Sequence, residues 1–124
     1  MTAEPPTPPR RDPFQPVDDA ARALARRLLG DARYGALATI DAADGHPMAS
    51  RVAVALDAEG APLLLISALS AHTGALEADP RCSLLVGEPG AGDPLAHPRL
   101  TVSGHARRIA RDDPSQPAVR TRWL

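Results

Sequence analysis

Five short segments rich in valine, leucine, isoleucine and threonine dominate this sequence, with turn residues between them. They are residues 35–41, 47–56, 62–67, 82–88 and 99–110. Runs of this length and composition predict β-strands, and the dipeptides Asp44-Gly45 and Glu59-Gly60 predict hairpin turns after the first two. Apolar and polar residues alternate over 100–103, as in a strand with one buried face. We therefore expect a mainly β protein, built as a meandering antiparallel barrel.

Two helices are predicted beside these strands. Residues 18–29 place apolar side chains at helical spacing behind the capping carboxylate of Asp18, and Gly30 follows as a stop signal. A shorter helix is predicted over 71–78, where Ser70 can cap the first turn and Pro80 discourages continuation. Prolines recur through residues 1–16 and favour extended backbone. We expect a disordered proline-rich tail, residues 1–16, followed by one domain, residues 17–124.

Composition limits the classes of function. A chain of 124 residues has room for one modest core, and a net charge of -1 with 2% aromatic residues gives no reason to expect nucleic acid. The apolar runs are shorter than the roughly 18 residues of a membrane-spanning helix. The single cysteine, Cys82, excludes an intramolecular disulfide and fits a cytoplasmic location. We interpret Cys82 as a small apolar residue of the fourth strand.

The start of the second helix is the strongest candidate for a binding site. Ser67 ends a predicted strand, Ser70 opens the helix, and His72 and Thr73 lie in its first turn. A helix N-terminus offers unpaired amides and the positive end of the dipole to an anion. Arg51, on a neighbouring strand, can add a bidentate contact. The pattern favours a phosphate site, but a capped helix with a solvated histidine explains the same residues.

Three stretches together resemble the pyridoxamine 5'-phosphate oxidase-like flavoproteins, namely residues 50–54, 65–73 and 78–86. Their order and spacing match that superfamily, and the resemblance extends over about residues 21–109. It implies an antiparallel split β-barrel of the type that binds flavin mononucleotide (FMN). The entry strand, residues 32–40, and the Ser-x-His-Thr turn look closest to the haem-utilisation branch of the superfamily.

The resemblance implies a set of cofactor-binding positions. In the family an arginine-led strand runs along the flavin, a hydroxyl residue ends the next strand, and a Ser-x-Lys or Ser-x-His turn grips the phosphate. A later strand presents a polar side chain to the flavin of the other subunit. The corresponding positions here are Arg51, Val52, Ser67, Ser70, His72, Thr73 and Arg99. We therefore expect FMN as cofactor, a homodimer with FMN at the subunit interface, and a small-molecule substrate.

Two features depart from the family pattern. The phosphate-site lysine of the oxidases proper is His72 here, and the sequence stops at Leu124 where relatives continue with another strand. Whether the barrel has its last strand therefore stays open. The function expected is an FMN-dependent oxidoreductase acting on an unidentified small molecule, with no catalytic residue assigned. The alternative is a non-catalytic flavin- or haem-binding carrier in haem utilisation.

Other chemistries lack their motifs. The four histidines, His46, His72, His97 and His105, form no close pair, so we expect no metal site. No GxSxG elbow surrounds any serine, and no GxGxxG follows a predicted strand. A serine hydrolase and a Rossmann-type dinucleotide site are therefore not supported.

Overall fold

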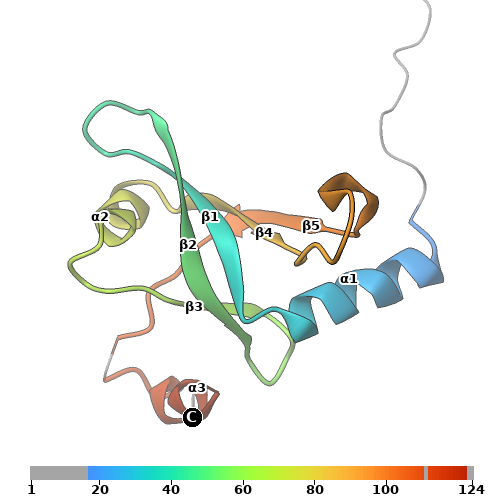
Figure 1. Cartoon of the computed structure of the whole chain (residues 1–124). Helices are drawn as coiled ribbons and strands as arrows, with labels where there is room; N and C mark the ends of the chain where they lie inside the picture. Colours follow the sequence, from blue (N-terminus) through green and yellow to red (C-terminus); the bar gives the residue numbers. More distant parts are fainter. Residues whose placement is uncertain (1–16, 111, 123–124) are drawn as a thin grey trace, which may run out of the picture.

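The computed structural model describes residues 17–110 and 112–122, so the predicted tail, residues 1–16, lies outside the described residues. In chain order the elements are α1 (Asp19–Asp31), β1 (Tyr34–Ile40), β2 (Pro47–Leu56), β3 (Pro62–Leu65), α2 (Ala71–Ala78), β4 (Arg81–Val86), the 3-10 helix η1 (Pro94–Ala96), β5 (Leu100–His105) and α3 (Gln116–Thr121). The strands form one curled antiparallel sheet with helices beside it (Figure 1). The prediction of a mainly β fold with flanking helices is confirmed.

The sheet is not a simple meander. Strands β1, β2 and β3 follow one another as antiparallel neighbours, but the chain then crosses through α2 so that β4 pairs with β1. Leu37 in β1 is opposite Ser50 on one side and Leu84 on the other. Strand β5 pairs with β4, which leaves β3 and β5 at the edges of the sheet order β3-β2-β1-β4-β5.

Several boundaries differ from the sequence expectations. The third strand ends at Leu65 instead of Ser67, because the chain turns there toward α2. The last strand was expected over 99–110 but ends at His105, after which the side chains of Arg107 and Arg108 form surface ion pairs. The short helices η1 and α3 were not expected. Among the described residues, no helix has the length and apolar character needed to cross a membrane.

The predicted hairpin turns and helix N-caps are present, but the predicted stop at Gly30 is wrong, because α1 continues through Gly30 to Asp31. Gly45 and Gly60 have φ angles of 72° and 86°, a region that favours glycine, at the two predicted hairpin turns. The side chain of Asp18 accepts a hydrogen bond from the backbone N–H of Ala21 at 2.8 Å, and the Ser70 hydroxyl accepts one from the N–H of His72 at 3.2 Å. These caps fix where α1 and α2 begin.

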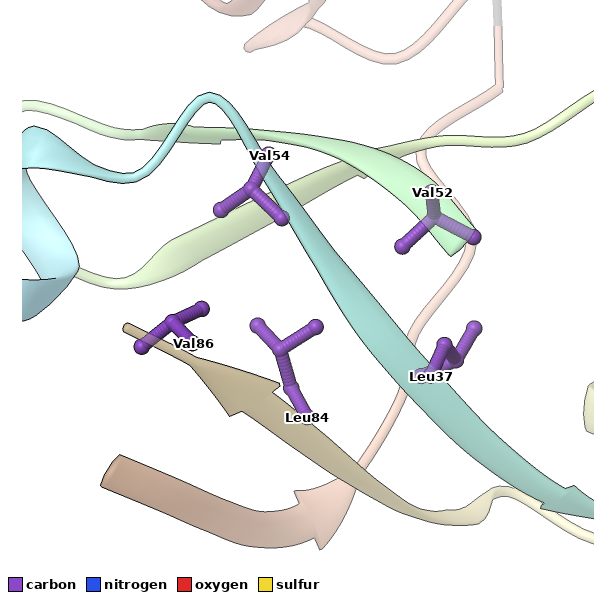
Figure 2. Close-up of a cluster of buried hydrophobic side chains, with 5 residues drawn as sticks. All are labelled: Leu37, Val52, Val54, Leu84 and Val86. Carbon is purple, nitrogen blue, oxygen red and sulfur yellow. The ribbon is translucent and has the colours of Figure 1, made fainter. Parts of the chain in front are cut away.

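The core lies on one face of the sheet. Its centre is formed by five side chains from β1, β2 and β4, which gather on that face (Figure 2): Leu37, Val52, Val54, Leu84 and Val86. Leu28 and Leu29 from α1 and Leu76 from α2 pack against this cluster. Because successive side chains of a strand point to opposite faces, the residues between these core positions point to the other face of the sheet.

Candidate functional site

The face opposite the core carries small and polar side chains. We call it the exposed sheet face, and its residues are Tyr34, Ala36, Ala38, Arg51, Arg81, Ser83, Leu85, Ser103 and His105. A cleft of about 570 Å³ opens on this face, and a second of about 350 Å³ lies where the face meets the end of α1 and the segment after β4. The larger cleft is shallow and open to solvent.

The larger cleft is lined by the start of β4 and the end of β5. Arg81 is opposite His105 in the register, and Ser83 is opposite Ser103. The two serine Oγ atoms lie 2.7 Å apart and share a hydrogen bond. Ala38 of β1 lines the same cleft. A guanidinium, an imidazole and two hydroxyls therefore surround a floor of small side chains.

An ion pair orients the arginine of this cleft. Arg81 Nε donates to both carboxylate oxygens of Asp79, at 3.0 and 3.2 Å, and Nη2 donates to Oδ2 at 2.7 Å. These hydrogen bonds lower the pKa of Asp79 to about 2, so the carboxylate is ionised at neutral pH. Within the described part of the chain, Arg81 Nη1 makes no hydrogen bond and stays available to a ligand.

Three residues of this cleft were not among the predicted site residues: Arg81, Ser83 and Ser103. Strand alternation in the sequence could have indicated them, because it places residues 81 and 83 on one face of β4 and residues 103 and 105 on one face of β5. The register that brings the two pairs together is set by the pairing of β4 with β5 and could not be read from local sequence.

The smaller cleft contains the predicted cofactor residue Arg51. Its guanidinium carbon lies 5.2 Å from the centre of the Tyr34 ring, within the range of a cation–π contact. The Glu88 carboxylate, as a hydrogen-bond partner, raises the pKa of Tyr34. The β2–β3 pairing stops at Ala53 and Leu65, so Ser67 lies beyond the paired part of β3.

The predicted phosphate turn forms one hydrogen-bonded unit. Ser67 Oγ accepts from the N–H of Leu69 at 3.2 Å, and Thr73 Oγ1 donates to the Ser67 carbonyl at 2.6 Å. The Ser70 hydroxyl caps α2, as described above. The structure therefore brings Ser67, Ser70 and Thr73 together, and uses their hydroxyl groups to hold the turn itself.

The backbone of His72 belongs to that turn, but its side chain points to the core side of the sheet. Its side chain is 7% exposed, and its ring hydrogen-bonds Thr39 of β1 through Nδ1 at 3.0 Å and Ser50 of β2 through Nε2. Because Ser50 and Arg51 are consecutive strand residues, His72 and Arg51 lie on opposite faces of the sheet. The imidazole joins α2 to the sheet, and the structure does not gather it with Arg51.

The two remaining predicted cofactor positions, Val52 and Arg99, do not line either cleft. Val52 is 8% exposed and belongs to the core, so its side chain does not face either cleft. Arg99 precedes β5 and donates from Nη1 to the Leu95 carbonyl at 3.3 Å, outside the lining of both clefts. Cys82 is partly buried, which raises the pKa of its thiol. In residues 17–110 and 112–122, no group of three or more metal-ligating side chains occurs.

Comparison with known proteins establishes the family. The profile of the pyridoxamine 5'-phosphate oxidase family matches residues 21–124. The chain belongs to this family, and its sheet is the split barrel that the sequence predicted.

Three relatives bear names that refer to heme. "Non-canonical heme oxygenase HOZ, chloroplastic" from Arabidopsis thaliana is 36% identical over 100 residues, which is 80% of this chain and 30% of that protein. A structure titled as a heme binding protein from Mycobacterium smegmatis has a TM-score of 0.73 and 36% identity, covering 86% of this chain and 43% of that one. HutZ from Vibrio cholerae, titled as a heme storage protein, has a TM-score of 0.66 and 25% identity, covering 83% and 71%. The chain thus spans less than half of the first two relatives.

Proposed function

We propose that this chain is a haem-binding protein of the pyridoxamine 5'-phosphate oxidase family. The exposed sheet face carries the proposal, because it combines an open cleft of about 570 Å³ with an imidazole and a guanidinium on its wall. A histidine is a common protein ligand of haem iron, and arginine pairs well with carboxylates such as the haem propionates. The donor set therefore fits haem. The three relatives named for heme support this choice.

The position of His72 makes FMN the second choice. The predicted phosphate site combined His72 with Arg51, Ser67 and Ser70. His72, however, has both ring nitrogens hydrogen-bonded on the core side of the sheet. A phosphate bound at the N-terminus of α2 would therefore not contact the His72 imidazole. When bound, haem would supply redox and oxygen chemistry, while the chain would supply binding and orientation.

The experiment is a titration of the full chain with hemin, FMN and riboflavin, each followed by absorbance and fluorescence. We expect saturable haem binding with a shifted Soret band. Haem loss under a reductant and oxygen would indicate a degrading enzyme, and stable bound haem would indicate a carrier. Haem absorbance equal to that of free hemin in buffer would refute the proposal.

FMN binding by an oxidoreductase is the second candidate. The cation of Arg51 on β2 favours it, together with the capped N-terminus of α2. Charge-assisted contacts of this type contribute roughly 1.5–3 kcal/mol, so Arg51→Ala should weaken FMN about tenfold to a hundredfold and leave riboflavin unchanged. Equal loss for both ligands would remove Arg51 from a phosphate site.

We also propose a homodimer in a cytoplasmic location. Leu65 and Leu69 are 60% and 96% exposed at the β3 edge and the following turn, which favours their burial against a second copy. A domain of this size also has little surface with which to enclose a large cofactor alone. Light scattering with and without hemin tests the assembly, and cell fractionation tests the location. A monomer holding one tightly bound haem would contradict the dimer.

A further inference from the structure

The four histidines of the chain differ in whether their rings are available to a ligand. His72 is 7% exposed and has both ring nitrogens occupied. His97 Nε2 hydrogen-bonds the Ala91 carbonyl at 2.8 Å, and His46 Nδ1 lies 3.4 Å from the Pro47 carbonyl in the β1–β2 turn. The ring of the exposed His105 makes no hydrogen bond to the described residues, and His105 lines the larger cleft. His105 is therefore the histidine that combines a free ring with a site.

The surroundings of His105 provide a complementary charge. Arg81 lies directly opposite His105 on β4. The Asp79 carboxylate binds Nε and Nη2 of the Arg81 guanidinium and does not bind Nη1. On the far side of this pair, Ser83, Ser103 and Ala38 contribute only small side chains to the cleft. A flat ligand can therefore approach the strands closely there. The cleft thus offers a metal ligand and a carboxylate partner on neighbouring strands, beside a floor that does not obstruct a large ring.

We propose that His105 is the protein ligand of haem iron in this chain, and that Arg81 pairs with a haem carboxylate. The proposal rests on the proposed haem-binding function and assigns residues to it. Neutral imidazole binds iron through a ring nitrogen, and a guanidinium binds a carboxylate through its N–H groups. Because the two residues are paired across β4 and β5, both contacts address the same ligand.

The iron ligand is tested by hemin titration of His105→Ala, with His97→Ala as the matched control. His97 is half-buried and lines neither cleft. We expect His105→Ala to bind hemin at least roughly tenfold more weakly and to lose the spectrum of an imidazole ligand. The control should match the unmodified chain. In His105→Gly, added imidazole should restore the spectrum, which a purely structural role would not produce.

The outcomes separate this assignment from the proposed function. If the unmodified chain and His105→Ala give the same haem spectrum and affinity, the assignment is wrong while haem binding stands. If His46→Ala abolishes the imidazole spectrum instead, His46 takes the role and the assignment is again overturned. If the unmodified chain shows no saturable haem binding, the proposed function and the assignment both fail. Thermal unfolding of each variant shows whether it is folded.

The carboxylate contact is tested by comparing hemin with its dimethyl ester, which lacks free carboxylates. Arg81→Gln should weaken hemin roughly threefold or more, since an exposed charge pair contributes modestly, and should leave the dimethyl ester unchanged. Arg108→Gln is the matched control, because Arg108 also forms an exposed ion pair, with Glu77 at 3.2 Å. If Arg81→Gln lowers the affinity for hemin and for its dimethyl ester equally, Arg81 does not contact a haem carboxylate.

Discussion

The hydrogen bonds of His72 give a sharp prediction about what holds α2 against the sheet. Thr39, which is 2% exposed, and the exposed Ser50 bond the two nitrogens of the same ring. Thr39→Val keeps the shape of the side chain but removes the hydroxyl. It leaves Nδ1 without a partner where water has little access. Ser50→Ala removes the other partner at a position that water can reach.

The two substitutions should therefore differ in cost. A buried polar atom left without a partner costs roughly 1–3 kcal/mol, so Thr39→Val should lower the free energy of unfolding by about that amount. For Ser50→Ala we expect about 0.5–1 kcal/mol, because water can replace the lost hydroxyl. In the double variant the loss should not be additive, since the two hydroxyls share one ring.

The assay is urea unfolding of the full chain followed by circular dichroism, with the midpoint and slope fitted for each variant. An unchanged slope is needed for the free energies to be compared. The reasoning is refuted if Ser50→Ala destabilises the chain as much as Thr39→Val does, or if Thr39→Val is neutral. Either result would mean that burial of the His72 ring does not control the cost.

Three further measurements test other parts of the structure. Gly35→Ala would place a Cβ 2.8 Å from a backbone carbonyl oxygen of β4, so it should destabilise the chain by about 1–3 kcal/mol in the same assay. Glu88→Gln should lower the raised pKa of Tyr34 toward about 10, measured cleanly by ultraviolet titration because Tyr34 is the only tyrosine. Arg81→Ala should return the pKa of Asp79 from about 2 toward roughly 4, measured by NMR. Because Asp79 is more acidic when folded, its contribution to stability should be present above pH of about 4 and lost as the pH falls toward 2.

Local signals were sufficient for the existence of the five strands, the first two turns and the helix N-caps, but not for the ends of β3, β5 and α1. The α2 bounds, 71–78, follow from the Ser70 cap and the Pro80 stop, and both hairpin turns have glycine at positive φ. The crossover that pairs β4 with β1 depends on contacts far apart in sequence. It left no local pattern, which is why a meander was expected in its place.

The candidate site was harder to predict than the fold. The sequence grouped Arg51 with His72 because both accompany a phosphate turn in the family, but strand alternation puts them on opposite faces. The cleft with His105 and Arg81 requires the β4–β5 register. That register joins residues 24 positions apart, since 105 − 81 = 24, so spacing arguments along the chain could not bring them together.

The most direct test of haem binding is the absorption spectrum of the untreated protein after expression with adequate haem supply. Mass identification of whatever is released on denaturation accompanies it. The account predicts a Soret band and release of haem, with the band reduced in His105→Ala and retained in His97→Ala. A yellow protein that releases FMN and has no Soret band, before or after added hemin, would contradict the account and favour the flavoprotein alternative.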